Sequence, residues 1–256
     1  MASARSSAST DFGAIRNPAG ERLDYAFHPG AADSDVVVVV GHGVTGNKDR
    51  EWALVLAETL SAAGLAALRL SFAGNGASEG DFRASCPTKE AAELGAVLER
   101  LAGRRVAFAG HSMGAAVGVL RASTDRRIAW LVSLAGMVDT EGFVARKFGH
   151  LVAGRDCMWD KPDCPFSQEF LADMLRIGSV EVLGASVHAP WLLVHGNADT
   201  VVPLAESERM SDLYGADLWR LPGADHVFSG AHAARMAEVV TAWLLDHGAA
   251  SPPERL

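Results

Sequence analysis

The hydrophobic pattern begins with an all-apolar run that is followed by apolar residues at helical spacing. Val36 to Val40 are five consecutive valines with no polar position among them. Such a β-branched run is typical of a strand buried on both faces of a parallel sheet. From Trp52 to Leu60 the apolar side chains form one helical stripe, and Gly64 follows where a helix would stop. The pattern therefore predicts a strand followed by a helix.

The same alternation continues almost to the end of the chain. Further strands are predicted at residues 65–72, 105–109, 128–135, 191–195 and 217–221. Further helices are predicted at residues 88–101, 112–122, 204–213 and 231–246. Strands that alternate with helices of this length are typical of a parallel, doubly wound sheet. The sequence therefore predicts the α/β fold class.

One segment, residues 137–186, interrupts this rhythm. It holds about 50 residues, which is too long for a plain connection in a compact α/β domain. We expect it to form a small cap on the carboxyl edge of the sheet, while residues 1–136 and 187–256 form the core domain. Its aromatic side chains would either form the cap's own core or line a substrate pocket; they are Phe143, Phe148, Trp159, Phe166 and Phe170.

Composition narrows the class of protein. The chain has 256 residues, of which 49% are hydrophobic and 21% charged, proportions that exclude a disordered or fibrous protein. A chain of this size can bury a sizeable core without metals or disulfides. Its 23 basic and 31 acidic residues leave a net charge of −8. This charge would repel a phosphate backbone, so we expect no nucleic-acid partner.

Cysteine usage and hydropathy bear on redox chemistry and location. The three cysteines cannot all pair with one another and form no C-x-x-C motif, so neither a disulfide scaffold nor a zinc site is expected. Pairing of Cys157 with Cys164 stays open. Residues 1–10 lack the apolar run of a secretory signal, and no apolar stretch is long enough to span a bilayer. We therefore expect a cytoplasmic protein.

Two segments fit the pattern G-x-S-x-G, around Ser112 and around Ser78. A nucleophilic serine needs a tight turn between a strand and a helix, which exposes its hydroxyl beside the N–H groups of the helix N-terminus. Ser112 has a predicted strand before it and a predicted helix after it. Ser78 lies between glycine-rich loops. We therefore predict Ser112 as a nucleophile and Ser78 as a turn residue.

A serine nucleophile needs a base, and the base needs an acid to orient it. Asp199 lies four residues beyond a predicted strand, and His226 lies just past the next one. Both loops open at the sheet edge that carries Ser112, and the chain order Ser, Asp, His is the one expected for this arrangement. We predict Asp199 as the acid and His226 as the base.

Other interpretations of these positions exist. Asp199 could form a turn or cap the following helix, and His226 could cap a helix. Asp139 and Asp225 are alternative acids, although Asp225 has poor geometry for orienting the adjacent His226. His232 is an alternative base, expected inside the last helix and facing away.

The oxyanion of an acyl-transfer reaction also needs hydrogen-bond donors. We predict the backbone N–H groups of Met113 and of Val44, which lies in the glycine-rich loop 41–48. That loop also fits the glycine pattern of a dinucleotide site. No acidic residue ends the next predicted strand, however, so no nucleotide cofactor is expected. We interpret His42 and His111 as structural residues near the turn.

Together these segments resemble the α/β-hydrolase superfamily from about Val36 to Leu245. Within it, residues 42–48 and 69–80 are similar to bacterial cinnamoyl and feruloyl esterases and to monoacylglycerol-lipase-like esterases, although Asn75 stands where these relatives usually have histidine. The resemblance implies a compact cap after the sixth strand, which residues 137–186 would supply.

The resemblance implies a serine esterase that cleaves small to medium or aromatic esters through an acyl-enzyme, without a metal or cofactor. Acyl transfer, thioester hydrolysis and carbon–carbon bond hydrolysis use the same triad and remain open, as does a catalytically silent binding protein. The acyl and alcohol specificity and the oligomeric state also remain open. The residues predicted to line the substrate pocket are His42, Phe143, Trp159, Phe170 and Val202.

Overall fold

A computed structural model describes residues 12–249 and contains a central seven-stranded sheet with the order β3-β5-β4-β6-β7-β8-β9. All neighbouring strands are parallel except β3, which pairs antiparallel with β5. The predicted α/β class and mostly parallel sheet are thereby confirmed. The strands are β3 (Tyr25–His28), β4 (Val36–Gly41), β5 (Ala66–Leu70), β6 (Arg105–His111), β7 (Ile128–Leu134), β8 (Trp191–Gly196) and β9 (Asp217–Leu221).

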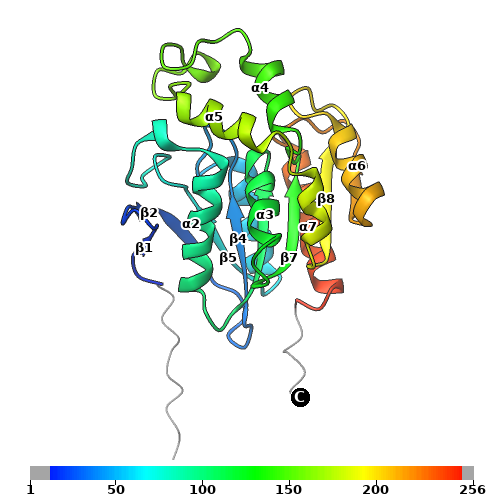
Figure 1. Cartoon of the computed structure of the whole chain (residues 1–256). Coiled ribbons are helices and arrows are strands. Elements are labelled where there is room, and N and C mark those ends of the chain that lie inside the picture. The colour runs from blue at the N-terminus through cyan, green and yellow to red at the C-terminus, as the bar shows by residue number, and fades with distance from the viewer. Residues whose placement is uncertain (1–11, 250–256) are drawn as a thin grey trace, which may run out of the picture.

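Helices cover both faces of the sheet (Figure 1). One face carries α1 (Glu51–Ala62) and α7 (Ala231–Asp246), and the other carries α2 (Pro87–Arg100), α3 (Met113–Ala122) and α6 (Leu204–Tyr214). The valine run of β4 shows why both layers are needed. Val37 and Val39 pack towards α2 and α3, whereas Val36, Val38 and Val40 pack towards α1 and α7. Successive side chains of a strand point to opposite faces, so each face of this strand needs an apolar cover.

Three short strands near the N-terminus were not predicted from the sequence. They are β3 and the separate two-stranded hairpin of β1 (Ile15–Arg16) and β2 (Arg22–Leu23). They hold two to four residues each and mix polar with apolar side chains, so they have no periodic signal. In chain order β7 is the fifth strand of the seven-stranded sheet, not the sixth implied by the resemblance.

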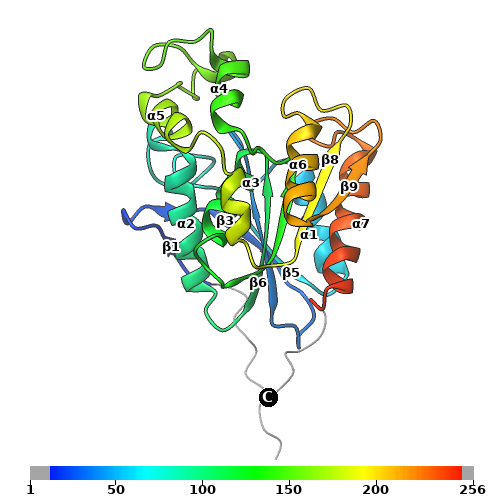
Figure 2. The same cartoon turned by 45° about the vertical axis from the view of Figure 1, so that its right-hand side comes forward.

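The segment between β7 and β8 contains α4 (Thr140–Phe148), η2 (Met158–Asp160), α5 (Gln168–Ile177) and η3 (Glu181–Ser186). Figures 1 and 2 show α4 and α5 above the carboxyl ends of the strands. Phe143, Phe148, Phe166 and Phe170 are buried together in an aromatic cluster that also includes Met113 of α3. Most of these aromatic side chains thus form a core between the segment and the sheet. By contrast, η3 packs against α3 and α6.

Candidate active site

Ser112 lies at a sharp turn between β6 and α3. Its φ of 53° and ψ of −119° are strained for a residue with a side chain. The turn also requires glycine on either side, because a Cβ atom at Gly110 would overlap the backbone of Gly114, and one at Gly114 would lie 2.6 Å from the carbonyl oxygen of His42. The prediction that Ser112 lies on a tight strand–helix turn is confirmed.

Backbone hydrogen bonds hold this turn in place. The N–H of Ser112 donates to the carbonyl oxygen of Leu134 at 2.9 Å, and the carbonyl of Ser112 accepts from Ala115 and Met137. Within residues 12–249 no hydrogen bond to the Ser112 hydroxyl is recorded, and this residue lines a cavity together with His226. The backbone is fixed, while the hydroxyl is available to a bound molecule.

His226 and Asp199 form a pair behind this cavity. The Nδ1 atom of His226 lies 2.8 Å from Oδ2 of Asp199, whose side chain is fully buried. The other carboxylate oxygen accepts the N–H groups of Val201 at 2.7 Å and Val202 at 3.0 Å. Because a carboxylate accepts the Nδ1 proton, Nε2 is the ring nitrogen that remains free to accept another proton. The structure brings together Ser112, Asp199 and His226 as the chain order predicts.

A further histidine, His195, contacts Asp199, and sequence reasoning assigned it no role. Its Nε2 atom lies 3.2 Å from Oδ2 of Asp199, and its Nδ1 atom lies 2.7 Å from Oγ of Ser207. Burial alone would raise the pKa of Asp199, but hydrogen bonds from His195 and His226 outweigh it and hold that pKa well below its ordinary value. The only available signal was its position near the end of β8, four residues before Asp199.

His42 and His111 both hydrogen-bond to backbone groups near the turn. The N–H of Phe72 donates to Nε2 of His42, so the His42 proton is on Nδ1, which donates to the carbonyl oxygen of Gly43 at 2.9 Å. His111 Nε2 donates to the carbonyl oxygen of His226 at 2.8 Å. Burial is the main cause that lowers the pKa of His42 to about 4 and that of His111 to about 3. Both rings are neutral near pH 7.

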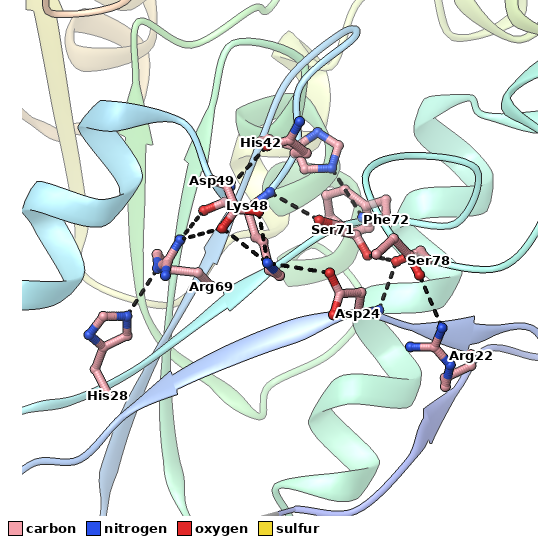
Figure 3. Close-up of polar contacts among 12 residues, drawn as sticks. Arg22, Asp24, His28, His42, Lys48, Asp49, Arg69, Ser71, Phe72 and Ser78 are labelled. Carbon is pink, nitrogen blue, oxygen red and sulfur yellow. Dashed lines mark hydrogen bonds and ion pairs between the residues drawn. The ribbon is translucent and has the colours of Figure 1, made fainter. Parts of the chain in front are cut away.

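Polar and charged side chains contact the loop 41–50, as Figure 3 shows. The Arg69 guanidinium donates to the carbonyl oxygen of Lys48, lies 3.1 Å from a carboxylate oxygen of Asp49 and donates to Nε2 of His28 at 3.0 Å. The hydroxyl of Ser71 accepts the N–H of Lys48 at 3.0 Å. The side chain of Arg69 is almost completely buried. The loop therefore rests on a rigid polar support.

The predicted oxyanion donors lie beside the turn. A Cβ atom at Gly43 would lie 2.7 Å from Cβ of Ser112 and 3.2 Å from the nitrogen of Met113, so the loop backbone is in close contact with the turn. Val44 lines the same cavity as Ser112. Among the described residues, neither the Val44 N–H nor the Met113 N–H donates a recorded hydrogen bond. Both donors are thus free for a ligand.

The cavity beside Ser112 has a volume of about 270 Å³. Of the residues predicted to line a substrate pocket, His42, Phe143 and Trp159 contribute to its wall. Phe170 and Val202 do not line it, and both are buried in the aromatic cluster.

The alternative residues have other contacts and lie outside this cavity. The hydroxyl of Ser78 donates to the carbonyl oxygen of Ser71 at 2.7 Å, and its N–H donates to the carbonyl oxygen of Asn75 at 3.1 Å, which places Ser78 at the end of a turn. Asp139 accepts the N–H of Gly142 and caps α4. Asp225 accepts the N–H of Ser229, and His232 lies in α7.

The described part of the chain gives three further findings. It contains no group of three or more His, Cys, Asp or Glu side chains placed to hold a metal ion. Its three cysteines are free, including Cys157 and Cys164. Its helices are too short or too polar to cross a lipid bilayer.

A doubly wound sheet with a strained serine, a histidine paired with a buried aspartate and free N–H groups at its carboxyl edge is the arrangement of α/β hydrolases. The chain matches the Alpha/beta hydrolase family over residues 36–241 and belongs to that family. The predicted membership is confirmed.

Comparison with solved structures agrees with this assignment. Est1E from Butyrivibrio proteoclasticus, with ferulic acid bound, has 23% identity and a TM-score of 0.81, covering 91% of this chain and 98% of that one. The esterase domain of a Rhodothermus marinus protein has 21% identity and a TM-score of 0.71, covering 91% and 96%. A monoacylglycerol lipase from Paleococcus ferrophilus has 18% identity and a TM-score of 0.68, covering 88% and 99%. No curated protein matches the chain.

Proposed function

We propose that this protein is a serine esterase that hydrolyses carboxylic esters. The observation that carries the proposal is the convergence of the strained Ser112 and the His226–Asp199 pair on one cavity. A serine hydroxyl is a weak nucleophile at neutral pH, and a neutral imidazole oriented by a carboxylate is the group that activates it. No other serine of the candidate motifs lines that cavity.

The first half-reaction forms an acyl-enzyme. Ser112 Oγ attacks the ester carbonyl carbon while Nε2 of His226 takes the hydroxyl proton. The N–H groups of Val44 and Met113 donate to the oxyanion, and each such donor is worth about 3 kcal/mol of transition-state stabilisation. The acyl C–O bond then breaks, and His226 gives its proton to the leaving alcohol.

The second half-reaction uses water in place of the alcohol. His226 takes a proton from water, whose oxygen attacks the acyl carbon, and the bond to Ser112 Oγ breaks as His226 returns the proton to the serine. The sum is ester plus water giving acid plus alcohol. Asp199 holds the imidazole tautomer and stabilises the imidazolium without taking the proton itself.

The size and walls of the cavity support small to medium or aromatic esters as substrates. Its volume of about 270 Å³ lies near the lower limit of small-molecule sites, and Phe143 and Trp159 supply aromatic surface. The solved structures named above include an esterase domain, a monoacylglycerol lipase and a ferulic acid complex, which supports the same class of chemistry. We further propose that α4, η2 and α5 act as the cap over this site.

The two serine motifs provide the test. Ser112→Ala should abolish hydrolysis of p-nitrophenyl esters and labelling by a fluorophosphonate probe, with an unchanged melting temperature. Ser78→Ala is the matched control and should keep both activities. The proposal is overturned if the wild-type protein neither hydrolyses a panel of esters nor labels, or if Ser78 is the residue required.

A further inference from the structure

The charge of the cavity is opposite in sign to that of the whole chain. The chain carries a net charge of −8, but the cavity wall includes Arg50 and Lys161 and no Asp or Glu side chain. Asp199 is fully buried behind His226 and does not reach the wall. A molecule that enters the cavity therefore meets two cations and no carboxylate.

Neither cation has an acidic partner within the described residues. No ion pair is recorded there for Arg50 or for Lys161, whereas Asp49, next to Arg50 in sequence, pairs with Lys48 and Arg69. Arg50 is also held in position, since its guanidinium donates to the carbonyl oxygen of Thr45 at 2.7 Å. A guanidinium without a carboxylate partner remains available to bind an anion.

The charge of Arg50 reaches the inner wall of the cavity. Burial is the main cause of the lowered pKa of His42 and of His111, and the Arg50 charge adds to it in both cases. Both histidines line the cavity. Because Arg50 lines the same cavity as Ser112, its positive charge faces a ligand bound beside that serine.

The rest of the cavity wall is largely apolar. Trp159 is 39% exposed and Val227 is 49% exposed, and both line the cavity together with Phe143 and Val201. An apolar wall beside two unpaired cations is complementary to a molecule with an apolar body and an anionic end.

We propose that the substrate is an ester that also carries a carboxylate, which Arg50 and Lys161 bind while Ser112 attacks the ester group. This inference rests on the proposed esterase function. The carboxylate takes no part in bond making or breaking, so water still adds across the ester bond to give an acid and an alcohol. Because the contact is made in the ground state as well as in the transition state, it lowers KM more than it changes kcat.

Two pairs of substrates test the proposal. The charge lies on the alcohol side in 4-acetoxybenzoate, whose neutral partner is its methyl ester. It lies on the acyl side in monomethyl adipate, whose neutral partner is methyl hexanoate. We expect the anionic member of at least one pair to have the higher kcat/KM, through a lower KM. We also expect this preference to shrink in about 1 M NaCl, where the screening length falls to about 3 Å.

Substitution of Arg50 and Lys161 tests whether these two side chains cause the preference for anionic esters. The double variant Arg50→Gln/Lys161→Gln should lower the ratio of anionic to neutral kcat/KM about tenfold, as expected for the loss of two partly exposed ion pairs. Arg104→Gln/Arg126→Gln is the matched control, because these arginines precede β6 and β7 at the opposite end of the strands, and it should leave the ratio unchanged.

The outcomes separate this inference from the proposed function. If no ester is hydrolysed, the esterase proposal fails, and the inference is judged by calorimetric binding of 4-acetoxybenzoate and of its methyl ester to Ser112→Ala. Tighter binding of the anion, lost in the Arg50/Lys161 variant, supports the inference. Preference for the neutral member of both pairs, or a ratio that the Arg50/Lys161 variant leaves unchanged, overturns it.

Discussion

The carboxylate of Asp199 is buried behind the cavity and is kept in its charged form by its hydrogen-bond partners. It is buried, and it accepts the N–H groups of Val201 and Val202 and contacts His195 and His226. These partners favour the charged form, so its pKa stays below the ordinary value despite burial. The carboxylate is therefore ionised throughout the neutral range and holds His226 in one tautomer.

Asp199→Asn tests this role. The asparagine amide cannot accept hydrogen bonds from both histidines and from the backbone, as the carboxylate does. The ring of His226 should therefore take the wrong tautomer, and kcat should fall by about 10⁴-fold. Steady-state hydrolysis of a p-nitrophenyl ester measures the change. Asp225→Asn, which alters the neighbouring carboxylate, should keep most of the activity. The reverse result would make Asp225 the orienting acid.

Three parallel strands place Ser112, Asp199 and His226 at the same edge of the sheet. The serine follows β6, the Asp199 loop follows β8 and the His226 loop follows β9, and all three strands are parallel. The carboxyl ends of parallel strands meet at one edge, where ligands of open α/β sheets bind. The α4–α5 segment covers that edge with the aromatic cluster, while Trp159 remains partly exposed at the cavity.

Trp159→Ala and Phe170→Ala separate the two roles of these aromatic side chains. Trp159→Ala should redistribute kcat/KM among esters of different acyl size, with a small acetyl ester affected least. Phe170→Ala should lower the unfolding free energy by about 3–5 kcal/mol, because it leaves a cavity in a buried cluster. Ester panels and thermal melts measure both. A parallel loss on all esters with a lower melting temperature for Trp159→Ala would assign it to the core instead.

Helix α2 contains a carboxyl group with an unusual environment. Glu90 is buried, its Oε2 atom has no hydrogen-bond partner among the described residues, and burial followed by the nearby Glu93 charge raises its pKa well above the ordinary value. The unfolded chain ionises at lower pH than the folded one, so this group costs stability increasingly as pH rises above about 4.5.

Glu90→Gln should remove that dependence. The variant's advantage over the wild type should grow as the pH rises above about 4.5, because only the unfolded wild-type chain gains from ionising Glu90. Urea unfolding at several pH values measures it, and Glu99→Gln on an exposed part of α2 is the control. A constant difference at all pH values would show that Glu90 is already ionised in the folded protein.

At the scale of the whole molecule, stability is expected to fall on the acid side because of buried neutral histidines. In the unfolded state His42 takes up a proton below about pH 6.5. In the folded state it stays neutral down to about pH 4. The unfolded state binds more protons in this window, so stability falls as pH falls through it.

His42→Gln should make this acid loss smaller by about 3 kcal/mol between pH 7 and pH 4. Glutamine does not titrate in this range, and His111 retains its own contribution. Urea unfolding at about pH 7 and about pH 4 compares the variant with the wild type. Equal losses in both proteins would mean that His42 is already protonated in the folded state.

Much of this molecule follows from local patterns in the sequence. The valine run of β4, the strand–helix alternation and the glycines around Ser112 act over short distances, through burial of both strand faces and through steric limits on one turn. The chain order of Ser112, Asp199 and His226 then follows, because loops after parallel strands open at one edge. These features therefore predicted the fold class and the placement of the three residues.

Contacts between distant segments were decided only by the tertiary structure. The carboxylate contact of His195, the burial of Phe170 and the approach of Arg50 and Lys161 to one cavity have no periodic signal. A hydrophobic period shows that a side chain is buried, but not which side chains of other elements surround it. The packing of α4, η2 and α5 over the sheet decides which residues form the core and which face the cavity, because close packing depends on the combined shapes of all the elements in contact.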